Sequence, residues 1–231
     1  MNLPTILVVD DEPQIRRTLG EALRDLPARV IDASTARGAL ESACRDRPNL
    51  ILLDLGLPDR SGLEVCTEIR RGSDIPIVVL SARHTETEKI QLLNAGADDY
   101  ISKPFGLAEL KARIRVQLRR TLTPEPSVGA VVEHDGLVID LARRSVRRGR
   151  TKIRLTPTEW SILHTLVQHG GRPVSHQQIF DAVWGRAFGN PQQYLRVFVT
   201  HLRRKVERNP ATPYVVITEP GFGYRFGADD V

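Results

Sequence analysis

The sequence predicts a doubly wound α/β domain followed by a smaller domain of short strands and helices. Three observations support this. The 231 residues suffice for one or two domains. The first half alternates aliphatic runs with helical patterns, and the second half does not. The net charge of +5 lies wholly in the second half, because residues 1–120 hold 18 basic and 18 acidic residues, whereas residues 121–231 hold 15 and 10.

Five strand–helix units are expected in residues 1–120. Near-continuous aliphatic runs are typical of strands buried on both faces of a parallel sheet. Three such runs occur, at Thr5–Val9, Asn49–Leu53 and Pro76–Leu80, and weaker strands are expected at Ala28–Asp32 and Ala97–Ile101. Apolar residues at helical spacing predict helices near 13–25, 35–46, 62–70, 85–94 and 107–120. Five such units indicate a doubly wound sheet.

Residues 121–128 contain two prolines and no periodic apolar pattern, so they are expected to form a linker. In residues 129–231, Asp135-Gly136 between two short alternating runs, Val131–Glu133 and Leu137–Leu141, signals a hairpin. Arg147–Arg150 is a candidate turn. Helices are expected from Thr156 to about Gln168, from Ser175 to about Trp184 and over Pro191–Arg208, and a closing hairpin over Tyr214–Thr218 and Gly223–Phe226. This order is typical of a winged helix-turn-helix domain.

The composition excludes several classes of protein. No apolar run approaches the roughly 18–20 residues that a membrane span needs, and the first residues do not resemble a signal peptide. Cys44 and Cys66 form no CxxC motif and are expected to be buried thiols of a cytosolic protein. The six histidines lack metal-ligand spacing, so a zinc site is not expected.

Polar side chains follow the predicted strands of the first domain. Asp10 and Asp11 follow the first strand, Asp54 the third, Ser81 the fourth and Lys103 the fifth. The carboxyl ends of parallel strands border the ligand crevice of an open α/β sheet, so these side chains should gather there. Clustered carboxylates require a cation, and Mg²⁺ prefers oxygen ligands. One carboxylate could then attack a phosphorus atom, with Lys103 and Ser81 contacting phosphoryl oxygens.

Each of these residues also has a simpler interpretation. The aspartates could cap helices, the serine could lie in a turn and the lysine could be a solvated surface residue. Chance placement of all five residues at the ends of strands is much less common than chance placement of any one of them. The chain has no glycine-rich phosphate loop, so nothing supports a nucleotide site.

Four motifs, ILVVDDE, LILLDLGLPDRSG, IVVLSA and GADDYISKPF, resemble the receiver domain of bacterial two-component response regulators in order and spacing. The resemblance implies that a sensor histidine kinase phosphorylates Asp54. It implies Mg²⁺ binding by Asp10, Asp11, Asp54 and the main-chain carbonyl of Gly56. It further implies a switch pair, Ser81 and Tyr100, a phosphate-binding Lys103 and a cis Lys103–Pro104 peptide.

The resemblance narrows to the OmpR/PhoB group, whose members form dimers through the fourth helix, fifth strand and fifth helix. The charged residues at the matching positions are Lys89 with Glu109, Asp99 with Arg113, and Asp98 with Arg120. A symmetric dimer would use this face twice. The alternative is an ordinary solvated face, the usual fate of surface charge.

The last predicted helix has a basic side. Leu195, Phe198, Val199, Leu202 and Val206 recur at three- and four-residue spacing and should be buried. This leaves a polar face that suits the DNA major groove, formed by Arg196, Thr200, His201, Arg203, Arg204 and Lys205. The alternatives are a surface histidine and a solvated basic helix end favoured by the helix dipole.

The motifs LTPTEW, LRRKVE and GFGYRF resemble the output domain of the same group, over about residues 129–227. Pro220 stands where many relatives carry a wing arginine, whereas Arg225 remains as a candidate DNA contact. The run Trp184–Tyr194 matches a loop that faces RNA polymerase. Within the group, Ser102–Gly106, Tyr194–Arg196 and Thr218–Phe226 resemble regulators of potassium transport in particular, which implies potassium-uptake genes as targets.

The sequence therefore predicts a phosphorylation-switched transcription regulator, not an enzyme, whose partners are promoter DNA, a kinase, RNA polymerase and a second copy of itself. Two alternatives remain. One is a phosphatase of the aspartyl-phosphate type, although no separate general acid is visible. The other is a receiver whose output domain binds protein or RNA. Binding of duplex DNA with a steep salt dependence would count against this second alternative.

Overall fold

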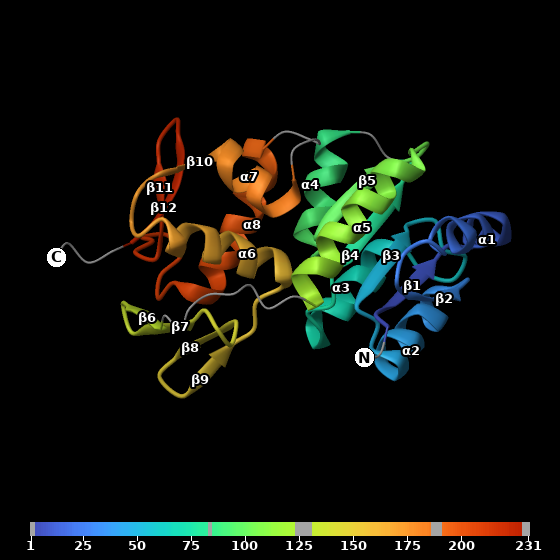
Figure 1. The fold of residues 1–231 in the computed structure, drawn as a ribbon, viewed down its shortest axis with the longest axis horizontal. Coiled ribbons are helices and arrows are strands. Elements are labelled where there is room, and N and C mark those ends of the chain that lie inside the picture. Colours follow the sequence, from blue (N-terminus) through green and yellow to red (C-terminus); the bar gives the residue numbers. More distant parts are fainter. Residues whose placement is uncertain (1–2, 83–84, 123–130, 186–190, 228–231) are drawn as a thin grey trace. The chain divides into compact units, whose positions relative to one another are not determined.

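The computed structural model describes residues 3–82, 85–122, 131–185 and 191–227, and the chain divides into two compact units, Met1–Leu122 and Thr123–Val231 (Figure 1). Within the described residues, no helix has both the length and the apolar character needed to cross a membrane.

The first unit is a five-stranded parallel sheet in the order β2-β1-β3-β4-β5. Its elements in chain order are β1 (Thr5–Val9), α1 (Pro13–Ala22), β2 (Arg29–Ala33), α2 (Ala36–Asp46), β3 (Leu50–Asp54), α3 (Gly62–Gly72), β4 (Ile77–Ser81), α4 (Glu86–Asn94), β5 (Asp99–Ser102) and α5 (Leu107–Leu122). On one face of the sheet, the apolar side chains of α1 and α5 pack in one cluster with alternate residues of β1, β3 and β4. Elsewhere, α2 packs against β1 and α3.

Local sequence explains where these elements begin. Thr35 and Ser61 each cap a helix by accepting a backbone N–H, and Thr85 forms a capping box with Glu88. Gly96 precedes β5 with φ at +105°, a conformation that favours glycine. A Cβ atom at Gly96 would also collide with the side chain of Arg70, so this position requires glycine for two independent reasons.

The second unit contains two antiparallel sheets and three helices. Its elements are β6 (Val131–His134), β7 (Leu137–Asp140), β8 (Ser145–Arg148), β9 (Thr151–Ile153), α6 (Pro157–Gln168), β10 (Val174–Ser175), α7 (His176–Trp184), α8 (Pro191–Val206), β11 (Val216–Glu219) and β12 (Gly223–Phe226). The sheet orders are β6-β7-β8-β9 and β10-β12-β11. The three helices pack on one another, and α6 also packs on β12. This arrangement is a winged helix-turn-helix domain, which confirms the predicted fold class.

The turn at Asp135-Gly136 is as predicted, since both residues have positive φ and connect β6 to β7. Strands β8, β9 and β10 were not predicted from the sequence. The two strands around Gly149 are short and rich in arginine, lysine and threonine, so they lack the aliphatic signal of the β1 type. Helix α5 continues to Leu122, past the predicted start of the linker at residue 121, and the rest of that linker lies outside the described residues.

Candidate functional site

The predicted polar residues meet at the carboxyl edge of the parallel sheet. Asp10 directly follows β1, and Asp54 is the last residue of β3. These two strands are neighbours, but the chain leaves β1 for β2 on one side and returns to β3 on the other. The site therefore lies at the point where the strand order reverses, which is where ligands bind in open α/β sheets.

The centre of the site is the ammonium group of Lys103, which bonds to two carboxylates. Its Nζ lies 2.9 Å from Asp10 Oδ2 and 2.6 Å from Asp54 Oδ1. The Asp10 side chain is fully buried, and those of Asp54 and Lys103 are 11% and 21% exposed. Burial opposes the charged form of Lys103, but the hydrogen bonds and charges of Asp54 and Asp10 outweigh it and hold its pKa above the ordinary value of 10.5. Lys103 therefore stays protonated at neutral pH.

Backbone contacts fix the remaining oxygen atoms of both carboxylates. The N–H of Gly56 donates to Asp54 Oδ2 at 2.5 Å, and the N–H of Glu12 donates to Asp10 Oδ1 at 3.0 Å. Helix α3 begins directly against this loop. The approach is so close that a Cβ atom at Gly62 would collide with the carbonyl oxygen of Asp54. The Lys103–Pro104 peptide is cis, as the resemblance implied.

The carboxylates of the site are candidate ligands of a divalent cation. Asp10 and Asp54 offer oxygen atoms, the donor type that Mg²⁺ prefers. Asp11 is exposed and follows Asp10 in the chain. No group of three or more histidine, cysteine or acidic side chains that could hold a metal ion is formed within the described residues. The donor chemistry fits Mg²⁺, but the two acids that share Lys103 would need further oxygen ligands to complete the coordination.

Arg16 supports this site and was not predicted. Its Nη1 donates to the carbonyl oxygens of Asp10 at 2.7 Å and Asp11 at 3.0 Å, and its Nε bonds to Asp32 Oδ2 at 3.0 Å. Arg16 thus holds the backbone of Asp10 and Asp11 in place. The sequence signal was weak, since an arginine on the first turn of a helix has no pattern that distinguishes it from a solvated one.

Ser81 and Tyr100 lie on neighbouring strands of the same sheet, β4 and β5. Ser81 is the last residue of β4 and is 2% exposed, and Tyr100 on β5 is 8% exposed. The Lys89 Nζ lies 5.1 Å from the centre of the Tyr100 ring. A hydrogen bond with Tyr100 is the main cause that raises the pKa of Lys89. The side chain of Tyr100 is therefore turned into the protein and contacts α4.

The charged residues predicted for the dimer face form contacts inside one chain. Arg113 Nη1 bonds to both carboxylate oxygens of Asp99, at 2.8 and 2.9 Å, and its Nη2 bonds to Glu109 at 2.9 Å. Asp98 is 1% exposed and is bonded to Arg70, which also donates to the carbonyl of Gly96 at 2.7 Å. The side chain of Arg120 lies outside the described residues. Asp98 is therefore less accessible to a second copy than the sequence suggested.

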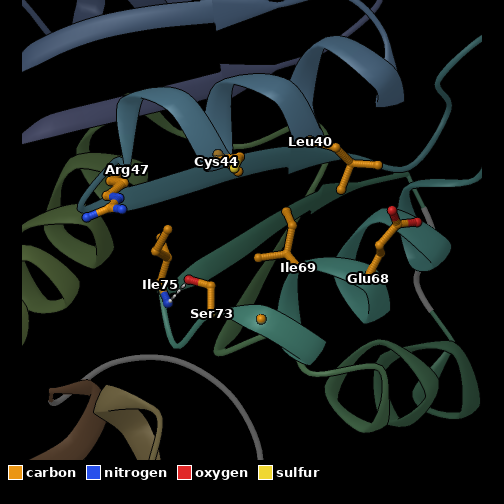
Figure 2. A pocket seen from close by; sticks show the side chains of 9 residues that line it. Leu40, Cys44, Arg47, Glu68, Ile69, Ser73 and Ile75 are labelled. Carbon is orange, nitrogen blue, oxygen red and sulfur yellow. Dashed lines mark hydrogen bonds between the residues drawn. The ribbon is translucent and has the colours of Figure 1, made fainter.

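Described residues of the first unit also line two cavities. The one in Figure 2 has a volume of about 570 Å³ between α2 and α3, and Cys44 and Ile69 are among its lining residues. The other, of about 640 Å³, is lined by α1 and β2. Neither is lined by Asp10, Asp54 or Lys103, so neither extends the site that these three residues form.

Helix α8 has the predicted buried face. Leu195, Phe198, Val199, Leu202 and Val206 are each at most 3% exposed. The polar side of α8 is not uniform. Of the six DNA contacts predicted on this helix, Arg196, Thr200 and Arg204 are exposed and the other three are partly buried. His201 is partly buried, and burial followed by the charges of Arg204 and Lys205 lowers its pKa. It is therefore a neutral hydrogen-bonding group at pH 7.

Three predicted DNA contacts bond within the unit instead. Arg203 bonds to the carbonyl oxygen of Val216 on β11. Lys205 Nζ lies 2.6 Å from Oε2 of the buried Glu159, and Arg225 Nε lies 2.6 Å from Glu219 Oε1. Charge at a helix end predicted a basic surface but did not distinguish free cations from those that hold the fold together.

Comparisons with known proteins agree with both units. The family of response regulator receiver domains matches residues 6–115, and that of the C-terminal domain of transcriptional regulatory proteins matches residues 149–226. The chain is 46% identical over 228 residues to the KDP operon transcriptional regulatory protein KdpE of Escherichia coli K12, covering 97% of this chain and 99% of that protein. It is 44% identical to KdpE of Mycobacterium tuberculosis CDC 1551, covering 96% and 99%.

A solved structure supports the same architecture. The response regulator DrrB of Thermotoga maritima, an OmpR/PhoB homologue, is 27% identical, with a TM-score of 0.53 over 98% of this chain and all of that chain.

Proposed function

Because the chain belongs to the OmpR/PhoB family of two-component response regulators, we propose that phosphorylation of Asp54 by a sensor histidine kinase controls its binding to promoter DNA. The observation that carries the proposal is the single ammonium group of Lys103 shared by Asp10 and Asp54. It places a fixed positive charge beside the carboxylate of Asp54, the last residue of β3 at the switch point of the sheet.

In the transfer step, a carboxylate oxygen of Asp54 attacks phosphorus. A P–O bond forms while the P–N bond to the kinase histidine breaks, and the histidine keeps the electron pair. The N–H of Gly56 orients one carboxylate oxygen, and Lys103 stabilises the negative charge that develops on the phosphoryl oxygens. Asp10, Asp11, Asp54 and the main-chain carbonyl of Gly56 would hold Mg²⁺, which supplies further positive charge there.

Two inward residues carry the response to phosphorylation in this proposal. Ser81 ends β4, next to β5, and turns towards a phosphoryl group on Asp54, and Tyr100 follows it. Tyr100 contacts Lys89, so its movement changes the charged face of α4, β5 and α5. Two copies then pair through this face, with Lys89, Asp98, Asp99, Glu109, Arg113 and Arg120 as its charged residues. Pairing favours binding because two linked readers have a high effective concentration on adjacent half-sites.

The second unit is the DNA reader in this proposal. Helix α8 enters the major groove, with Arg196, Thr200, His201 and Arg204 as contacts, while Arg203, Lys205 and Arg225 are contacts only after their present bonds break. We place the protein in the cytoplasm, where DNA and RNA polymerase are accessible. The run Trp184–Tyr194 faces polymerase, although its residues 186–190 lie outside the described part. The likeness to KdpE supports potassium-uptake genes as targets.

The test is a genomic DNA pull-down with the full chain, Mg²⁺ and acetyl phosphate, comparing wild type with Asp54→Ala. A surface variant, Asp46→Ala, is the matched control, since Asp46 bonds only to the neighbouring Arg45 among described residues. We expect a repeated motif, enriched about tenfold less by Asp54→Ala because the effective concentration of a linked pair is lost.

Other outcomes separate the alternatives. Equal enrichment by Asp54→Ala and wild type would retain the DNA reader and reject the switch. No enrichment by any variant would favour an output that binds protein or RNA. Release of more than one phosphate per chain from small phosphoesters would favour the phosphatase.

A further inference from the structure

The three cations at the end of α8 have different surroundings. Lys205 bonds to Glu159, whose Oε2 also accepts the N–H of Thr156 in the capping box of α6. Arg203 points to the hairpin formed by β11 and β12. Arg204, between them, is exposed and forms no ion pair with a described residue. Three consecutive charges therefore have three different roles.

Arg203 contacts both strands of the hairpin. Its Nε and Nη2 donate to the carbonyl oxygen of Val216, at 2.9 and 2.6 Å, and Nη2 also donates to Thr218 Oγ1 at 2.7 Å. The centre of its guanidinium lies 5.9 Å from the centre of the Tyr224 ring, and Tyr224 is the cross-strand partner of Thr218. Burial lowers the pKa of Arg203, but a guanidinium remains charged in proteins.

Glu207, one helical turn after Arg203, binds the same strand. Its carboxylate accepts the N–H groups of Tyr214, Val215 and Val216, with the last at 2.8 Å. The N–H and the C=O of Val216 are thus bonded by two side chains four residues apart. Glu207 directly follows α8, and its N–H still donates to the carbonyl oxygen of Arg203 at 2.9 Å, so the two side chains keep the spacing of one helical turn. Strand β11 is at the edge of its sheet, so these side chains satisfy backbone groups that an edge strand leaves open.

We propose that Arg203 is a positioning residue. Together with Glu207 it fixes the wing, which is the hairpin of β11 and β12, to α8, the helix that reads DNA. The exposed row Arg196–Thr200–Arg204 on α8 then contacts DNA. This inference rests on the proposed DNA-binding function. The row follows from four-residue spacing, which places its members on one face of α8, and from the exposure of all three. Arg203 acts on DNA through the wing, whose distance and angle from this row it sets.

The test compares Arg203→Lys with Arg204→Lys, because each variant keeps its charge and the two positions are adjacent. A lysine can replace an arginine that contacts phosphate, but it has no planar fork for a carbonyl, a hydroxyl and a ring. In the full chain, we expect amide hydrogen exchange of residues 216–226 to be about tenfold faster in Arg203→Lys and unchanged in Arg204→Lys. Thr218→Val removes one of the three Arg203 contacts without changing charge, and should show a smaller effect in the same direction.

The second measurement is the affinity for a fluorescent 30-base-pair duplex carrying the motif enriched by wild type. We expect Arg203→Lys to bind about tenfold more weakly although its charge is unchanged, and the effects of Arg203→Lys and Thr218→Val to be less than additive. Far-UV circular dichroism and the thermal midpoint establish that each variant is folded, so a change in affinity is not a change in folded fraction.

Two results would overturn the inference. The first is amide hydrogen exchange of residues 216–226 that is unchanged in Arg203→Lys. The second is wild-type affinity for the duplex in Arg203→Lys together with a loss of affinity in Arg203→Ala, which is the behaviour of a phosphate contact. If wild type binds no duplex, the proposed DNA-binding function fails, while the exchange measurement still decides whether Arg203 fixes the hairpin.

Discussion

Replacing Lys103 with methionine should destabilise the first unit strongly, because it removes the cation between two carboxylates. Lys103 Nζ lies within 2.9 Å of both Asp10 and Asp54, and the three side chains are at most 21% exposed. Removing one partner of a buried ion pair costs about 3–5 kcal/mol. Since Lys103 is partly in contact with water, we expect a loss of about 2–4 kcal/mol in the free energy of unfolding of this unit.

Urea unfolding of the full chain can measure this loss with an internal control. Both tryptophans, Trp160 and Trp184, belong to the second unit, so fluorescence reports that unit and far-UV circular dichroism reports both. A loss of this size should lower the urea midpoint of the first unit by about 1–2 M, with the fluorescence midpoint unchanged. Lys111→Met is the matched variant, since Lys111 pairs with an exposed Asp25 and its loss should have a much smaller effect.

The pH dependence follows from the raised pKa of Lys103. A lysine whose folded pKa is raised contributes stability that is fully present below its unfolded pKa and is lost as the pH rises through its folded pKa. That value lies above 10.5 here, so the difference between wild type and Lys103→Met should be equal at pH 7 and pH 9. Mg²⁺ should reduce the difference, because a bound cation would stabilise the same carboxylates. Equal urea midpoints for Lys103→Met and Lys111→Met at pH 7 would refute this account of the site.

Two further predictions concern buried groups elsewhere. Glu207→Gln should lower the free energy of unfolding of the second unit by about 2–4 kcal/mol. In the variant, a single neutral amide oxygen replaces the two carboxylate oxygens that accept three backbone N–H groups. An unchanged urea midpoint of tryptophan fluorescence would contradict this. Cys44 is exposed, whereas burial raises the pKa of Cys66 to about 12; a thiol reagent at pH 8 should therefore label one cysteine per native chain and two in urea, and rapid labelling of Cys44→Ser would show that Cys66 is accessible.

The sheet and the cluster of Asp10, Asp54 and Lys103 were predictable because their signals are local. Strands buried on both faces are continuous aliphatic runs, and the residue after each run must lie at the carboxyl edge. The topology therefore places Asp54 and Lys103 at the same edge of the sheet. Arg16 and Arg70 were not predictable, since their bonds join residues that only the fold brings together: Arg16 with Asp32, and Arg70 with Asp98 from a different helix–strand unit.

Charge counting fails in the second unit for the same reason. Its excess of basic residues predicts a polyanion partner, but the count treats every arginine as free. Arg203, Arg204 and Lys205 have equal charge and adjacent positions, and they differ only in what lies opposite: an edge strand, solvent and a buried glutamate. A helix that reads DNA must also be held to its own wing, and one planar guanidinium can bond a carbonyl and a hydroxyl while covering a ring. The same chemistry that lets arginine bind nucleic acid thus also lets it bond elements of the fold to one another, and only the fold distinguishes the two roles.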